Sequence, residues 1–228
     1  LLVVLLGVIE RRRLEDLGAD RLESGSREHL LVGLARGLGR LLLGLAVGVD
    51  PRAVLRPDVG ALARGPAPFL ILDPRGIGEV RDKSCGRDGF LEPYGSDFLY
   101  ASTEIMLGRS LLGRRVHDAL RCLDFLQAAG APVGRLVGRG IGSLTAVFAA
   151  LLHPSRPEVR LLAYLPSFED LVQDDLPRWP LSSLLPGGLR DFDLPDLYRV
   201  LGDRLTLGQP WDPRLTPRSE PSKPVPGA

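Results

Sequence analysis

The sequence predicts an α/β fold built on a mostly parallel β-sheet that is covered by helices on both faces. Three observations indicate this class. Short apolar segments rich in Val, Leu and Ile alternate along the chain with longer segments of helical periodicity. A glycine-rich turn joins one of these strands directly to a helix. Hydrophobic residues form 44% of the 228 residues and charged residues 25%, which is typical of a globular domain with a sizeable core.

The N-terminal part of the chain contains two predicted strands and one predicted helix. Leu1 to Ile9 is short and apolar, as in a buried strand. Leucines at helical spacing predict an amphipathic helix over Arg27 to Val47. Prolines break the segment from Asp50 to Pro68, so we expect an irregular connection there. Phe69 to Leu72 is the next predicted strand.

The middle of the chain contains the longest periodic pattern and the sharpest turn. Ser102 to Ala129 has helical periodicity, with a possible break near Gly108 or Gly113, and Gly130 suits the C-terminal end of a helix. Arg135 to Val137 is strand-like, and Ser143 to Leu152 follows the glycine-rich turn as an apolar helix of small residues.

The C-terminal part begins with a strand over Val159 to Leu165. Residues 166–200 are expected to form an excursion over the sheet that ends in a short helix, Asp193 to Leu201, before a strand over Arg204 to Leu207. We expect one domain over residues 1–212 and a disordered proline-rich tail over residues 213–228. Because the chain begins with Leu1 rather than methionine, we expect either that it is processed or that its N-terminal part is missing.

Composition argues against several classes of protein. The net charge of +1, from 29 basic and 28 acidic residues, indicates neither a nucleic-acid partner nor an anionic membrane surface. Leu1 to Ile9 is too short to span a bilayer, and Arg36 and Arg40 interrupt the other apolar stretch. Two free thiols, Cys85 and Cys122, are favoured over a disulfide and are too few for a cysteine-based zinc site. We therefore expect no metal and no cofactor.

Four segments, taken in order, resemble the α/β-hydrolase superfamily, particularly its acetylxylan-esterase-like and carboxylesterase members. They are Leu72 to Gly78, which is similar to a D-x-R-G-x-G loop after a central strand; the helix Arg114 to Leu126; the strand–turn–helix Arg135 to Leu152; and Pro186 to Leu197 ahead of a strand. The resemblance implies a three-layer α/β/α sandwich of the α/β-hydrolase type, carboxylic-ester hydrolysis, and a small ester or acylated sugar as ligand. The last strand of that fold is expected to be missing from this chain.

The turn at Gly138-Arg139-Gly140-Ile141-Gly142 resembles the G-x-S-x-G nucleophile elbow. In that motif the flanking glycines let strand and helix pass closely, and the residue after the serine donates its N–H to the oxyanion. Gly138 and Gly142 hold the two glycine positions, and Ile141 holds the oxyanion position. The nucleophile seat itself is Gly140, which has no nucleophilic atom, so we expect a catalytically impaired or inactive protein.

Ser143 is the nearest hydroxyl to the turn and is the alternative nucleophile. It falls in the first turn of the following helix, where a serine commonly satisfies a backbone N–H, and we favour that interpretation.

Asp212 follows the strand after which the superfamily carries its catalytic acid, and it is equally well interpreted as a turn aspartate before Pro213. The resemblance places the catalytic histidine later in the chain, but no histidine follows Asp212. His29, His117 and His153 are predicted to be surface or helix-end residues, and no two of them have metal-ligand spacing.

Two further interpretations stay open. Without a nucleophile, the same fold can serve as a non-catalytic binding or structural module. Gly138 to Ser143 also approximates the G-x-G-x-x-G dinucleotide fingerprint with serine in place of the third glycine. That fingerprint requires an acidic residue at the end of the next strand, and Glu169 and Asp170 come late for it.

Overall fold

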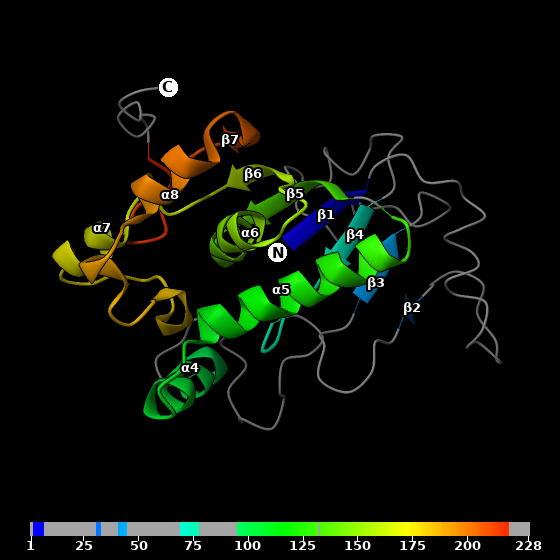
Figure 1. The fold of residues 1–228 in the computed structure, drawn as a ribbon. Coiled ribbons are helices and arrows are strands. Elements are labelled where there is room, and N and C mark those ends of the chain that lie inside the picture. The colour runs from blue at the N-terminus through cyan, green and yellow to red at the C-terminus, as the bar shows by residue number, and fades with distance from the viewer. Residues whose placement is uncertain are drawn as a thin grey trace.

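The computed structural model describes residues 2–6, 31–32, 41–44, 69–77, 95–131 and 133–218 (Figure 1). These residues form an α/β fold in which helices pack against a seven-stranded sheet. The strand order is β2-β3-β4-β1-β5-β6-β7. The strands are β1 Leu2–Leu6, β2 Leu31–Val32, β3 Leu41–Gly44, β4 Phe69–Leu72, β5 Val133–Arg139, β6 Glu158–Leu162 and β7 Leu205–Leu207.

The sheet is mixed, and its parallel part consists of the three strands β5, β6 and β7. β1 lies between β4 and β5 and runs antiparallel to both, and β3 is antiparallel to β4. The expectation of a mostly parallel sheet was therefore wrong for its N-terminal half. A short apolar run such as that of β1 predicts burial in a sheet, but its pattern carries no information on strand direction.

The prediction of a helix over residues 27–47 was also wrong where the structure describes that range. Two strands, β2 and β3, pair there in antiparallel register, with Leu31 opposite Leu42 and Val32 opposite Leu41. Leucine-rich runs satisfy helical and strand patterns alike, and the pairing of β3 with β4 decides between them here. The predicted irregular segment over residues 50–68 lies outside the described residues.

Five helices are described: α4 Ser96–Met106, α5 Leu111–Ala128, α6 Ile141–Leu152, α7 Phe168–Gln173 and α8 Leu194–Leu201. The long predicted helix is divided into α4 and α5, and the break falls at Gly108, which has a φ of 70°. Ser110 then begins α5 by accepting a hydrogen bond from the amide of Gly113. The predicted strand and helix around the glycine-rich turn are present as β5 and α6.

The described helices form one layer on one face of the sheet. α6 packs on β5, β6 and β1, and both α5 and α8 contact α6 (Figure 1). Three connections cross over the sheet and step in the same direction along the strand order: β4 to β5, β5 to β6, and β6 to β7. Because such crossovers are right-handed, their helices fall on a single face.

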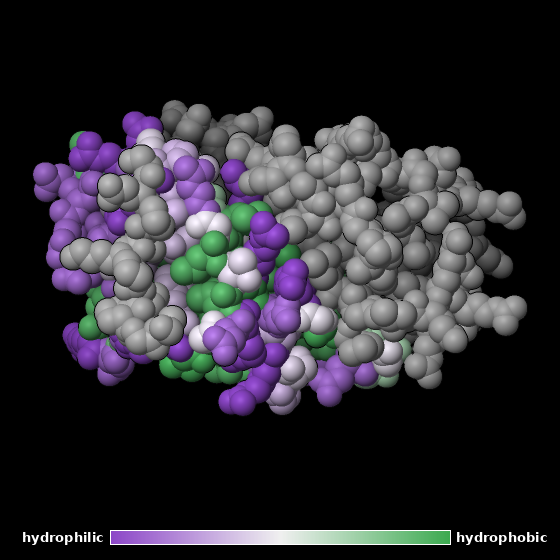
Figure 2. Space-filling view, turned by 90° about the horizontal axis from the view of Figure 1, so that it is seen from above, coloured by the Kyte–Doolittle hydropathy of each residue, from purple (hydrophilic) through white to green (hydrophobic). Residues whose placement is uncertain are grey.

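The core lies between this helix layer and the sheet. Its members are apolar side chains of β5, β6, α5, α6 and α8, including Leu123, Leu126, Leu136, Leu144, Val147, Leu161 and Leu194. On the face drawn in Figure 2, apolar residues gather in a central area with polar side chains beside them.

The segment between β6 and β7 packs against the helices, and its helix α8 contacts α6. Its 3-10 turn η2, Leu181–Ser183, contacts α4 and α5. The chain after β7 is folded through Arg218, although we expected disorder from residue 213. The amide of Arg178 donates a hydrogen bond to the Pro213 carbonyl, and Trp211 forms an antiparallel β-bridge with Pro217. Residues 219–228 lie outside the described residues.

Candidate functional site

The glycine-rich turn between β5 and α6 has the backbone geometry of a sharp strand-to-helix elbow. Gly140 is the N-cap of α6, with φ 56° and ψ −127°. This combination lies outside the regions that residues with a Cβ normally occupy, and a side chain there is held under strain.

Gly138 marks the closest approach of β5 and α6. A Cβ on this residue would lie 2.5 Å from the Gly142 carbonyl oxygen and 2.6 Å from the Cα of Ser143. Both are backbone atoms at the start of α6, which cannot move aside easily. Strand and helix therefore cross this closely only because Gly138 has no side chain, as the motif predicts.

Gly140 itself faces open space. A Cβ built on it meets no atom within 4 Å, so the position has room for a side chain despite its strained angles. Ile141 follows as the first residue of α6, whose N-terminal amides carry partial positive charge. An electronegative atom placed near the start of this helix would be stabilised.

Ser143 is buried and turned into the elbow. Its hydroxyl donates to the Gly140 carbonyl over 2.6 Å, and its amide donates to the same oxygen over 2.9 Å. The side chain therefore stabilises the turn, but by donating to a carbonyl rather than by accepting from an amide as we expected. It is 0% exposed, so a substrate does not reach it in this conformation.

The loop after β4 lies at the same edge of the sheet as the elbow. Leu2 of β1 pairs with Leu72 on one side and Gly138 on the other. The ends of β4 and β5 are therefore two strand spacings apart, roughly 10 Å. Residues 73–77 follow β4 in a turn that is closed by a hydrogen bond from the Ile77 amide to the Pro74 carbonyl.

A buried ionic network holds this loop against α5, and the sequence analysis missed it. Arg75 forms a bidentate pair with Asp118, which is 1% exposed. Arg115 donates to the Arg75 carbonyl over 3.1 Å, to Asp97 over 3.1 Å and to Ser182 over 2.6 Å. Burial lowers the pKa of Arg115, while hydrogen bonding to Asp118 raises that of Arg75. In the sequence, the only indication of this network was that Arg115 and Asp118 are three residues apart and therefore lie on the same, buried face of α5.

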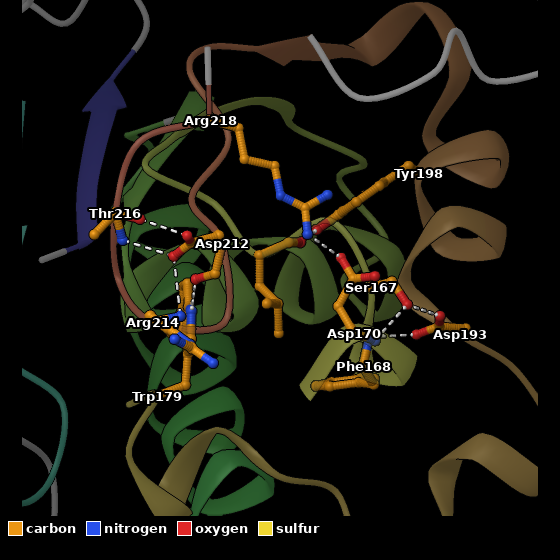
Figure 3. A network of polar contacts seen from close by, with 11 residues as sticks. Ser167, Phe168, Asp170, Trp179, Asp193, Tyr198, Asp212, Arg214, Thr216 and Arg218 are labelled. Atoms are coloured by element: carbon orange, nitrogen blue, oxygen red, sulfur yellow. Dashed lines mark hydrogen bonds and ion pairs between the residues drawn. The ribbon is translucent and has the colours of Figure 1, made fainter. Parts of the chain in front are cut away.

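Asp212 forms a local turn (Figure 3). Its carboxylate accepts hydrogen bonds from the amides of Arg214 and Thr216, over 2.9 and 2.8 Å, and from the Thr216 hydroxyl. Burial alone would raise the pKa of Asp212, but these hydrogen bonds and the charge of Arg218 hold it below its usual value. The described hydrogen bonds of the Asp212 carboxylate all come from residues 214 and 216, as expected of a turn aspartate.

The elbow and the Asp212 turn nevertheless lie side by side. The guanidinium of Arg139 stacks over the ring of Trp211, 5.2 Å from its centroid. Each of these two residues directly precedes a predicted site residue, Gly140 or Asp212. The structure therefore brings Gly140 and Asp212, the positions predicted for the nucleophile and the acid, to one edge of the sheet.

A second polar network lies beside this turn and was also missed. The Asp193 carboxylate accepts from the Ser167 hydroxyl and from the Phe168 amide, while Arg218 pairs with Asp170 over 2.6 Å (Figure 3). These contacts link the segment after β6 to the start of α8 and to the chain after β7.

The two described histidines lie on α5 and at the end of α6. His117 is exposed on α5. His153 caps the far end of α6, and this helix of 12 residues places it roughly 17 Å from the elbow. His29 lies outside the described residues. Among the residues that the structure describes, no group of three or more His, Cys, Asp or Glu could hold a metal ion. Within the same residues, no helix is long and apolar enough to cross a membrane.

Comparison with known proteins adds no family assignment, because no family model, curated protein or solved structure matches the chain.

Proposed function

We propose that this chain is an α/β-hydrolase-type protein related to carboxylic-ester hydrolases, and that its elbow no longer carries out hydrolysis. The observation that carries the proposal is Gly140, with φ 56° and ψ −127° between β5 and α6 and with open space where a side chain would project. The close crossing at Gly138 supports it further, because the motif uses a glycine there for this purpose. A three-layer arrangement of the hydrolase type is part of the same proposal, although the helices that the structure describes cover one face of the sheet.

The chemistry of the elbow follows from what Gly140 lacks. Ester hydrolysis at this position needs a hydroxyl that attacks the acyl carbon and a base that takes its proton. Gly140 supplies no attacking atom, and His153 lies at the opposite end of α6 from the elbow. The start of α6 still favours an electronegative atom. The site is therefore suited to hold a small ester or acylated sugar without cleaving it, which is a binding function.

The dinucleotide interpretation has less support. β6 ends at Leu162, and the four residues after it, Ala163 to Pro166, include no acid to bind a ribose hydroxyl. Asp170 is paired with Arg218 in the structure.

Turnover of p-nitrophenyl acetate tests the proposal. The steady-state rate at which the purified chain releases p-nitrophenolate is expected to be no higher than the rate of spontaneous hydrolysis in buffer. Gly140→Ser is expected to add little turnover, because serine needs an adjacent base. Gly140→Ala, which has no hydroxyl, is the matched control for strain at this position. Fast turnover by the unmodified chain that Ser143→Ala abolishes would identify Ser143 as a displaced nucleophile and contradict the proposal.

A further inference from the structure

A serine, a histidine and an aspartate meet at the edge of the sheet opposite the elbow. His153 follows the last turn of α6, Ser155 stands in the turn after it, and Asp124 projects from α5. The Ser155 hydroxyl oxygen lies 2.7 Å from Nδ1 of His153, and Nε2 of the same ring lies 3.3 Å from Oδ1 of Asp124. The three side chains come from two elements that the packing of α5 on α6 brings together.

The hydrogen bonds decide which ring nitrogen carries the proton. The backbone amide of Ser155 donates to Nδ1 of His153 over 3.2 Å, and an amide can only donate. Nδ1 of the neutral ring is therefore an acceptor, and its second close contact, with the Ser155 hydroxyl, is one in which the hydroxyl donates. The proton of the ring then lies on Nε2, which is 3.3 Å from Oδ1 of Asp124, within ion-pair distance but without the geometry of a hydrogen bond.

This arrangement is that of a serine with a general base and a carboxylate behind the base. The ring of His153 is 3% exposed, so its orientation is fixed by the surrounding packing. Ser155, by contrast, is an exposed residue whose hydroxyl makes a partly buried contact with His153. Asp124 is held in turn by Arg121, at 3.1 Å.

We propose that Ser155 is an acyl-acceptor site, activated by His153 and Asp124, that takes an acyl group from a small activated ester. Oγ of Ser155 attacks the carbonyl carbon, and its proton passes to Nδ1 of His153, which then no longer accepts the hydrogen bond from the Ser155 amide. The bond from carbon to the leaving oxygen breaks, the alcoholate or phenolate departs, and the proton on His153 returns to the leaving group or to water. Asp124 stabilises the imidazolium by its negative charge, 3.3 Å from Nε2.

The same geometry limits the reaction to a slow, single transfer. Ser155 follows the C-terminal end of α6, where the helix presents carbonyl oxygens and partial negative charge rather than amides. An oxyanion is not stabilised by such an end, and that stabilisation contributes roughly 100- to 1000-fold to serine enzymes. The acyl-serine should therefore form and persist, without rapid turnover. The site is independent of the elbow, because no residue is shared between them.

The test is acetylation by p-nitrophenyl acetate, followed by peptide mass spectrometry. Ser155 is expected to gain one acetyl group on the order of 100-fold faster than Ser102, whose hydroxyl donates to a backbone carbonyl and has no base. His153→Asn keeps an acceptor near the Ser155 amide but provides no base, so acetylation of Ser155 should fall to the rate of Ser102. Asp124→Asn should slow it by a smaller factor.

Circular dichroism of each variant shows whether the fold is retained. Labelling of Ser155 in the unmodified chain at the rate of Ser102, or labelling that His153→Asn leaves unchanged in a folded protein, would overturn the proposal. His153 and Ser155 would then only close the turn after α6.

Discussion

Substitution of Gly138 by alanine tests how closely β5 and α6 approach each other at the elbow. The added Cβ would lie 2.5 Å from the Gly142 carbonyl oxygen and 2.6 Å from the Cα of Ser143, far inside van der Waals contact. Because both neighbours are backbone, the strand or the helix has to shift. Overpacking of this kind costs about 3 kcal/mol at the upper end of its usual range.

A loss of about 3 kcal/mol should lower the melting temperature by roughly 6–12 °C for a domain of this size. Urea denaturation followed by tryptophan fluorescence measures the free energy of unfolding directly. Gly113→Ala is the matched control: Gly113 is exposed in α5, its Cβ would meet only the Ser110 Cβ at 3.8 Å, and alanine should stabilise the helix by about 0.5–1 kcal/mol. A loss below about 1 kcal/mol for Gly138→Ala would refute the close crossing.

Three further predictions concern buried and hydrogen-bonded groups. Arg115→Ala should lower the free energy of unfolding by about 3–5 kcal/mol, because it leaves the buried Asp97 carboxylate without its ion pair; a change under about 1 kcal/mol in urea denaturation would contradict the network. The pKa of Asp212 is lower in the folded chain than in the unfolded chain, where it has the ordinary value of about 4. The Asp212 carboxylate therefore stabilises the fold above about pH 4, and this stabilisation is lost as the pH falls through the lower, folded-state pKa. Asp212→Asn should therefore destabilise the protein more at pH 7 than at pH 3, and an equal effect at both values would count against the turn. Burial raises the pKa of Cys122 to about 12, so its thiol should not react with a disulfide reagent at pH 8 until urea unfolds the chain; prompt reaction of the native protein would show that Cys122 is accessible.

The sequence predicted the elements whose patterns are long or locally determined. β4 has the predicted bounds. α5 lies within the predicted helical segment, and α6 ends where predicted but begins two residues earlier, at Ile141. Apolar residues at helical spacing bury one face of a helix whatever its neighbours are. The glycine elbow was predictable for the same reason. Its backbone angles at Gly140 and its close contact at Gly138 are requirements of one short segment.

The features that the sequence did not predict depend on partners far along the chain. The antiparallel direction of β1 is decided by its pairing with β4 and β5. The pairing of β3 with β4 likewise decides that strands form where a helix was expected near the N-terminus. Arg115 meets Ser182 across 67 residues, a separation that no local pattern spans. The contacts of Asp212 are local, but Asp-Pro fits a turn and a catalytic acid equally well in sequence.

The reactivity of a thiol placed at the elbow tests most directly whether Gly140 occupies a nucleophile seat. In a Gly140→Cys variant, the new side chain would project into open space at the N-terminus of α6, where partial positive charge stabilises a thiolate. We predict that iodoacetamide alkylates this thiol with an apparent pKa at least one unit below the ordinary value of about 8.5. A His117→Cys variant, with its thiol exposed in the middle of α5, should show the ordinary value. An unreactive thiol at position 140, or one whose pKa equals that of the control, would contradict the account.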